Sequence, residues 1–153
     1  MYFKQDNNLG LRDFAETDFV QIQKLWSDIG LGAMQRGDNE KIITETINNG
    51  GKFLVLEDTS SKQIIGTSWI TNDKRRLYLH HFGIKKEHQG KGYSKLLLKE
   101  TLRFAKSLGL QIKLEVNAEN FKAVNLYQNF GFKHLGDYDI FIIRDYKNIL
   151  FDE

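Results

Sequence analysis

The stretch from residue 77 to residue 108 reads LYLHHFGIKKEHQGKGYSKLLLKETLRFAKSL and decides the fold. Its first eight residues are mostly apolar and aromatic, which predicts a strand. A loop containing Gly90 and Gly92 follows, and apolar residues then recur at helical spacing until Gly109. Because residues 112–116 alternate like a second strand, the chain here predicts a strand–loop–helix–strand unit whose two strands are parallel neighbours.

The residues before this unit predict an antiparallel meander. Runs 53–56 and 64–70 are apolar, and a polar turn over 58–61 separates them. The run 77–84 then supplies the third strand of the meander.

An earlier strand is predicted over 9–14, and two short helices after it. Thr17 and Asp38 are the expected N-caps of these helices, which should end near Gly30 and Gly50. Asn120 is the expected cap of a last helix, and the run 135–143 is strand-like, as one long strand or a tight pair.

Length and composition limit the class of protein. The 153 residues predict one domain spanning 1–153, and 22 basic against 20 acidic residues leave a net charge of +2, which disfavours nucleic acid as a partner. Cysteine is absent, which excludes disulfides, thiolate metal sites and a cysteine nucleophile. No run has signal-peptide or membrane-spanning character, so we expect a cytoplasmic protein without a membrane partner.

The glycine loop Gln89–Ser94 predicts an anion site. A strand that runs into a glycine loop and a helix N-terminus gathers bare N–H groups, and glycines let a phosphate approach them. The loop lacks the third glycine of a dinucleotide fingerprint and the Gly-Lys-Ser/Thr ending of a nucleotide-triphosphate loop. An ordinary turn is the alternative reading for an isolated Gly-x-Gly.

Two motifs together resemble the GNAT superfamily of N-acetyltransferases. The family's pyrophosphate loop is Gln/Arg-x-x-Gly-x-Gly/Ala, and Gln89, Gly92 and Ser94 fill its three places, with Ser94 departing from the pattern. The segment 120–127 is similar to the family's Asn-x-x-Ala-x-x-Leu-Tyr, with Gly-Phe at 131–132. The strong resemblance covers residues 51–132.

The resemblance implies a mixed α/β fold of the GNAT type. That fold has a mostly antiparallel twisted sheet with a parallel pair at the cofactor site and about four flanking helices. It also implies acetyl-CoA as co-substrate, and it assigns the following cofactor-binding residues: Phe82, Gly83, Ile84, Gln89, Gly90, Lys91, Gly92, Tyr93, Ser94, Asn120 and Tyr127.

Acetyl transfer to an amine needs a proton acceptor. A primary amine of pKa ~10 costs ~4 kcal/mol to deprotonate at pH 7, and histidine suits this task. His80 and His81 are adjacent on a strand, so their side chains should point to opposite faces. His80 shares the parity of Phe82 and Ile84 and matches a proton-relay histidine of the arylalkylamine branch. We therefore expect His80 as base, directly or through a water molecule, and His81 either in packing or in support of the base. His81 or water as the base stays an open alternative, and the structural alternative for His80 is a hydrogen-bonded core residue.

The departing thiolate needs a proton donor. Tyr127 stands at the family's usual general-acid position, although it also lies on the apolar stripe of its helix and has a packing alternative. The four histidines, His80, His81, His88 and His134, do not show metal-ligand spacing, so no metal is expected.

The sequence thus predicts an acyltransferase of the EC 2.3.1 type. It would transfer acetyl directly, in a ternary complex, from acetyl-CoA to a primary amine of a small molecule, peptide or protein, as a monomer or homodimer. A catalytically weak acyl-CoA-binding sensor or scaffold on the same fold is the alternative. The acceptor stays open. The elements that border the acceptor side in this family carry the following residues, for each of which packing or solvation is the alternative explanation: Trp26, Met34, Arg36, Trp69, Asp137 and Tyr138.

Overall fold

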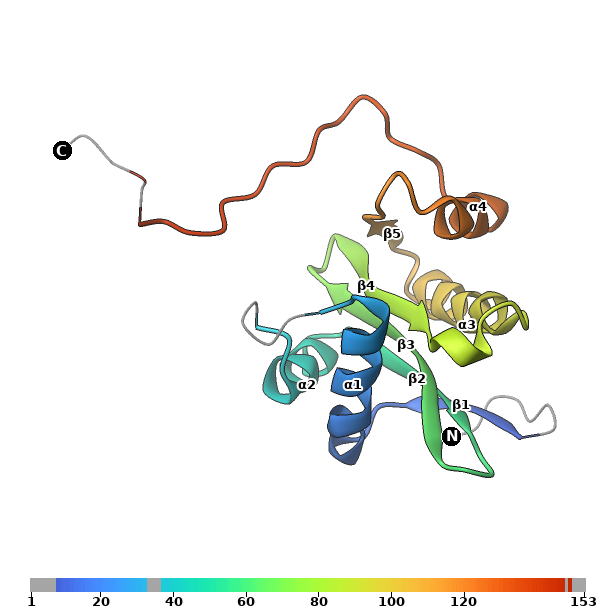
Figure 1. The fold of residues 1–153 in the computed structure, drawn as a ribbon. Helices are drawn as coiled ribbons and strands as arrows, with labels where there is room; N and C mark the ends of the chain where they lie inside the picture. The colour runs from blue at the N-terminus through green and yellow to red at the C-terminus, as the bar shows by residue number, and fades with distance from the viewer. Residues whose placement is uncertain (1–7, 33–36, 148, 150–153) are drawn as a thin grey trace. The chain divides into compact units, whose positions relative to one another are not determined.

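The computed structural model describes residues 8–32, 37–147 and 149 (Figure 1). Contacts divide the chain into two compact units, Met1–Glu115 and Val116–Glu153, and each is described by itself. The first unit contains, in chain order, β1 (Leu9–Asp13), η1 (Glu16–Asp18), α1 (Phe19–Ile29), α2 (Glu40–Asn48), β2 (Lys52–Asp58), β3 (Gln63–Asn72), β4 (Arg76–Ile84), η3 (Lys86–His88), α3 (Tyr93–Leu108) and β5 (Gln111–Leu114). The second contains α4 (Phe121–Asn129).

The five strands form one sheet in the order β1-β2-β3-β4-β5. The first four pair antiparallel, and β4 and β5 pair parallel. The meander and the parallel crossover through α3 are therefore as the sequence predicts, and the mixed α/β fold class is confirmed.

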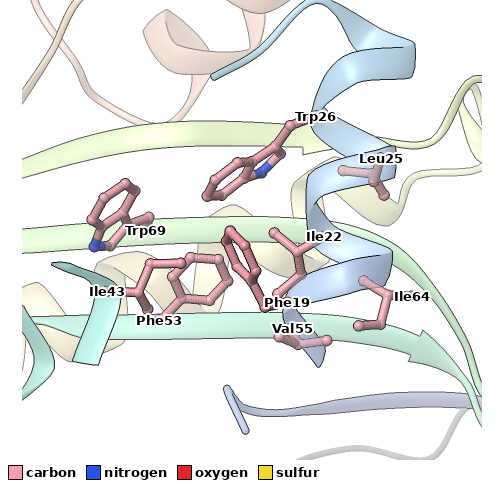
Figure 2. Close-up of a cluster of buried hydrophobic side chains, with 9 residues drawn as sticks. All are labelled: Phe19, Ile22, Leu25, Trp26, Ile43, Phe53, Val55, Ile64 and Trp69. Carbon is pink, nitrogen blue, oxygen red and sulfur yellow. The ribbon is translucent and has the colours of Figure 1, made fainter. Parts of the chain in front are cut away.

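The two faces of the sheet carry separate cores because side chains alternate along each strand. On β2, Phe53 and Val55 pack with residues of α1 and α2, whereas Leu54 and Leu56 pack with Leu97 of α3. Figure 2 shows the first cluster, in which the rings of Trp26 and Trp69 lie nearly parallel with centroids 6.0 Å apart. α1 and α2 thus cover one face and α3 the other (Figure 1).

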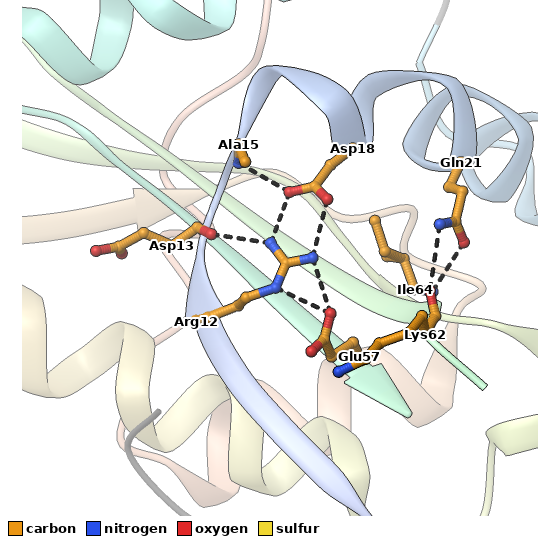
Figure 3. Close-up of polar contacts among 8 residues, drawn as sticks. All are labelled: Arg12, Asp13, Ala15, Asp18, Gln21, Glu57, Lys62 and Ile64. Carbon is orange, nitrogen blue, oxygen red and sulfur yellow. Dashed lines mark hydrogen bonds and ion pairs between the residues drawn. The ribbon is translucent and has the colours of Figure 1, made fainter. Parts of the chain in front are cut away.

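A buried ion network joins β1, η1 and β2 (Figure 3). The Arg12 guanidinium donates to both carboxylate oxygens of Asp18, at 2.7 and 2.9 Å, and to Glu57 at 2.9 Å. These hydrogen bonds, led by the one to Asp18, raise the pKa of Arg12 above its ordinary value against the opposing effect of burial. Asp18 and Glu57 are buried, so the guanidinium compensates two carboxylates that are largely removed from water.

Two predicted helix caps are displaced by one residue. Asp18 rather than Thr17 precedes α1, since Thr17 lies inside η1. Asn39 rather than Asp38 caps α2, and its side-chain oxygen accepts the Ile42 N–H at 3.0 Å. The carboxylate of Asp38 pairs with His81 instead.

The second unit begins its helix as predicted, with Asn120 accepting the Ala123 N–H at 3.2 Å. The prediction of a strand within 135–143 is wrong: these residues form no strand. The segment is rich in β-branched and aromatic residues, but a strand also needs a hydrogen-bonded neighbour, and here the large side chains, Phe141 at 90% among them, are exposed.

No helix within the described residues is both long and apolar enough to cross a bilayer.

Candidate active site

One edge of β4 is open over half of its length. β5 pairs only with Arg76–Leu79, whereas β4 continues to Ile84. On the β5 side, no strand within the described residues pairs with the last part of β4, 80–84. Backbone N–H and C=O groups on such an edge can pair with an extended ligand.

The loop after β4 presents the start of α3 to solvent. Gly90 and Gly92 have left-handed backbones, with φ of 76° and 82°, and a Cβ on either would meet nothing within 4 Å. Gly92 occupies the N-cap of α3, and no side chain caps that end. The first N–H groups of a helix have no intrahelical acceptor, so this turn offers donors to an anion.

The other residues of the loop have side chains with local roles. Gln89 is exposed, and its amide donates to the Ile84 carbonyl at 2.9 Å. The Tyr93 ring lies against His88, with centroids 6.3 Å apart, and packs against the α3-side core. A cavity of about 420 Å³ borders the loop and is lined by Asn8, Leu9, Asp58, Ile65, His88, Lys91 and Tyr93.

Gly83 of β4 lies close against the end of α1 and against Leu31. A Cβ there would lie 2.5 Å from the Ile29 side chain and 3.0 Å from that of Leu31. The end of α1 therefore rests directly on the strand at the open edge.

The expectation that His80 and His81 point to opposite faces is wrong. The register of β3 against β4 shifts between Thr67 and Trp69, and His81 has a φ of 46°. Both rings consequently lie against Trp69, with centroids 5.9 Å away for His80 and 5.2 Å for His81. The same bulge separates His80 from Phe82 and Ile84, which belong to the α3-side core.

His80 is part of a polar row where β4 and β5 separate. Its Nε2 lies 2.9 Å from Thr71 Oγ1, and its ring stacks on Tyr78 at 5.2 Å. The Tyr78 hydroxyl donates to Glu115 at 3.1 Å. Burial lowers the pKa of His80, positive charge on His81 lowers it further, and the carboxylates of Glu115 and Asp38 act in the opposite direction.

His81 is enclosed on the same face. Its Nε2 lies 3.1 Å from Asp38 Oδ2, and its ring lies 4.4 Å from that of Trp26. Sequence reasoning missed Asp38, Thr71 and Glu115 as neighbours of the histidines. Of these three residues, only Glu115 could have been found from the sequence. It directly follows residues 111–114, and the parallel pairing of that strand brings it beside β4.

Tyr127 and Asn120 lie in the second unit. Tyr127 is buried with its ring 5.6 Å from Phe132, and burial raises the pKa of its phenol to about 12. Asn120 caps α4 as predicted. The structure therefore brings together the open edge, the glycine loop and His80 in one unit, and Tyr127 and Asn120 in the other.

The acceptor-side candidates fall into three groups. Met34 and Arg36 lie outside the described residues. Trp26 and Trp69 are core residues, 3% and 4% exposed. Asp137 and Tyr138 are exposed in the second unit.

A model of the acetyltransferase (GNAT) family matches residues 14–132. The chain belongs to this family. The match covers the open edge of β4, the glycine loop and α4, so the resemblance seen in the sequence is confirmed and the chain carries a GNAT acetyltransferase domain.

Curated relatives are N-acetyltransferases. The human N-acetyltransferase 8B is 33% identical over 94 residues, which are 57% of this chain and 40% of that protein. A probable spermine N(1)-acetyltransferase of Bacillus subtilis subsp. natto is 37% identical over 70 residues, which are 44% of this chain and 46% of that protein. The chain thus spans less than half the length of either relative.

Solved structures share the fold. An acetyltransferase of the GNAT family from Staphylococcus aureus superposes with a TM-score of 0.75 at 19% identity, covering 86% of this chain and 88% of that one. A GNAT acetyltransferase from Elizabethkingia anophelis with acetyl-CoA bound gives a TM-score of 0.59 at 15% identity, covering 84% and 78%.

Proposed function

We propose that the chain is an acetyl-CoA-dependent N-acetyltransferase that transfers acetyl directly to a primary amine in a ternary complex. One observation carries the proposal: the open edge of β4, ending at Ile84, leads through a solvent-exposed glycine loop into the uncapped start of α3. This arrangement offers backbone pairing to an extended chain and N–H donors to a phosphate at its end, which are the two chemical features of a pantetheine diphosphate.

The cofactor side uses mainly backbone groups. Phe82, Gly83 and Ile84 would pair with the pantetheine, and the loop Gln89–Ser94 would hold the pyrophosphate. Since a Cβ at Gly90 or Gly92 would meet nothing within 4 Å, the space before these residues is open to a ligand. Asn120 is a further contact through its side-chain amide. When bound, acetyl-CoA supplies an activated acyl group as a thioester.

His80 is the proposed proton acceptor for the amine. Its lowered pKa keeps the imidazole neutral at pH 7, as a base requires. His80 directly follows Leu79, where the pairing of β4 with β5 ends, and this position supports the role. The alternation of His80 with Phe82 and Ile84 along the strand no longer supports it, because the bulge interrupts that alternation.

Tyr127 is the proposed hydrogen-bond donor to the departing thiolate. A phenol whose pKa is raised to about 12 stays protonated at neutral pH, so it can donate a hydrogen bond to the departing thiolate. Because a thiol has an ordinary pKa of ~8.5, complete transfer of the proton from this phenol to the thiolate is uphill, and the proposed role is stabilisation of the leaving sulfur as it develops charge. The absence of cysteine in the chain supports direct attack by the amine rather than transfer through an acyl-cysteine.

The test measures CoA release from acetyl-CoA against a panel of amines that includes spermine and peptides with free N-termini. We expect amine-dependent release, and we expect His80→Ala and Tyr127→Phe each to lower kcat/KM about 100-fold or more while acetyl-CoA still binds. His134→Ala and Tyr146→Phe are the matched controls, since both residues are exposed and lie outside the proposed site.

Release that never exceeds background with any amine would overturn the enzymatic proposal. If acetyl-CoA still raised the melting temperature in that case, the acyl-CoA-binding sensor would be the function.

A further inference from the structure

His81 holds a backbone conformation that is rare for a residue with a side chain. Its φ of 46° lies in the left-handed region, at the point where β4 bulges against β3. Such conformations persist where several contacts fix them, and they concentrate at functional sites. The residues that contact His81 are therefore the ones that stabilise the bulge.

Contacts from four residues hold His81 in place. Asp38 Oδ2 lies 3.1 Å from its Nε2, and the rings of Trp26 and Trp69 lie 4.4 and 5.2 Å from the imidazole. The Thr67 hydroxyl donates to the His81 carbonyl at 2.8 Å and accepts the Trp26 indole N–H at 2.9 Å. Side chain and main chain of the bulge are thus both fixed.

The fit around the imidazole is close. A Cβ on Gly32 would lie 2.9 Å from the Trp26 ring and 3.1 Å from His81 Nε2. The side chain of His81 is 16% exposed and that of Asp38 is 15% exposed. Water therefore competes little with their hydrogen bond.

Packing alone does not explain a histidine here. Its Nδ1 is buried and has no hydrogen-bond partner within the described residues, so the ring carries an uncompensated polar atom. An apolar side chain would fill the space between two indoles without that penalty, but it could neither pair with Asp38 nor tolerate the left-handed backbone as histidine does.

The bulge lies between His80, the proposed base, and the open edge of β4 that is proposed to pair with pantetheine. β5 stops pairing at Leu79, His80 follows immediately, and the open edge runs on through Phe82 to Ile84. A change at His81 would rotate His80 and shift the register of the edge together. We infer that Asp38 and His81 form a positioning pair that locks the β4 bulge, and so sets His80 against the thioester-binding edge. This inference rests on the proposed acetyl transfer.

The experiment compares variants that distinguish the backbone conformation of His81 from its side-chain contact with Asp38. His81→Asn keeps a residue that tolerates a positive φ, but its amide is shorter than the imidazole and loses the contact that Nε2 makes with Asp38, whereas His81→Val loses that contact and also opposes the conformation. Asp38→Ala removes the partner. We expect kcat to fall at least tenfold for Asp38→Ala and His81→Asn, which lose the pair, and further for His81→Val, which also opposes the backbone conformation, with the KM for acetyl-CoA changed less than threefold in all three.

Lys62→Val is the matched control for strain. Lys62 has a φ of 58° in the turn between β2 and β3 and is not among the residues of the proposed site, so the same substitution opposes the same backbone conformation there. Its kcat should equal that of the wild type. Circular dichroism and thermal melts on every variant identify those that are folded.

Three outcomes overturn the inference. If folded Asp38→Ala and His81→Val keep wild-type kcat, the pair only packs. If His81→Asn is as inactive as His81→Val and the acid limb of its pH profile is lost, His81 is itself the base. If KM for acetyl-CoA rises as much as kcat falls, the bulge serves cofactor binding and not His80. Failure of the proposed function is distinct from all three, because the wild type would then release no CoA.

Discussion

The side-chain amide of Gln89 donates to the carbonyl of Ile84 at 2.9 Å, so the last residue of the open strand and the first residue of the glycine loop are tied to each other. The bond spans the short η3 turn between them. It fixes the direction in which the loop leaves the strand, and with it the distance between the edge that would pair with pantetheine and the helix end that would hold phosphate.

Gln89→Ala should therefore weaken acetyl-CoA binding. A neutral hydrogen bond contributes ~1 kcal/mol, and ~1.4 kcal/mol corresponds to a tenfold change, so we expect Kd to rise roughly three- to tenfold. Titration calorimetry with acetyl-CoA measures the change. Gln89→Glu keeps the length of the side chain but loses the N–H donor and adds a negative charge beside the proposed phosphate site, so its Kd should rise at least as much as that of the alanine variant. An unchanged Kd in both variants would show that the bond does not align the loop.

Gly92→Ala tests the helix end itself. Gly92 has a φ of 82° and Gly109, at the other end of α3, has a φ of 67°. A methyl group at either position should destabilise the fold by ~1–2 kcal/mol, since the left-handed region disfavours a Cβ. Only Gly92→Ala should also weaken acetyl-CoA binding, because only Gly92 leads into the proposed phosphate site. Equal losses of affinity in the two variants would place the effect in α3 as a whole.

The sequence was sufficient to predict the elements whose residues alternate or recur regularly. Strand β4, the loop from Gln89, α3 and the parallel β5 follow from local patterns, because each buries a regular set of apolar residues. The prediction of a strand at 135–143 was wrong for a related reason. The β propensity of these residues is a local property, whereas a strand forms only beside a hydrogen-bonded partner strand.

The predicted face of each histidine failed because a bulge is a tertiary feature. Parity along β4 assumed that side chains alternate without interruption, and one left-handed residue, His81, reverses it. The role of Asp38 was hidden for the same reason, since its partner lies 43 positions away in sequence. The sequence identified the two histidines as candidate bases, but it did not show which face of the sheet each side chain lies on.

The pH dependence should report the environment of His80. Burial lowers its pKa below the ordinary ~6.5, so the neutral base persists to lower pH than a free imidazole would. We expect the acid limb of kcat/KM to have a midpoint below 6.5, with activity lost as pH falls through it. Glu115→Gln removes a carboxylate that raises this pKa, so the limb should move to still lower pH.

Glu16→Gln is the matched control for that shift, because Glu16 is an exposed carboxylate in η1. Its pH profile should coincide with that of the wild type. A Glu115→Gln profile that moved to higher pH, or did not move, would contradict the assignment of the limb to His80.

Replacement of Arg12 should be the most destabilising single change outside the two cores. Its guanidinium lies 2.7 Å from Asp18 and 2.8 Å from Glu57, whose side chains are 8% and 4% exposed. Arg12→Ala leaves both carboxylates buried without their cation, which costs ~3–5 kcal/mol in comparable networks. Urea unfolding measures the loss, and acetyl-CoA affinity measured below the transition should be retained.

The exposed pair Lys41–Glu45 gives the contrasting case. Its charged atoms are 3.9 Å apart, and the side chains are 83% and 52% exposed, so Lys41→Ala should cost no more than ~0.5 kcal/mol. Arg12→Met separates charge from volume: it should recover part of the packing lost in Arg12→Ala but remain well below the wild type, because the carboxylates stay buried. If Arg12→Met unfolded at the same urea concentration as the wild type, the network would contribute packing and not charge compensation.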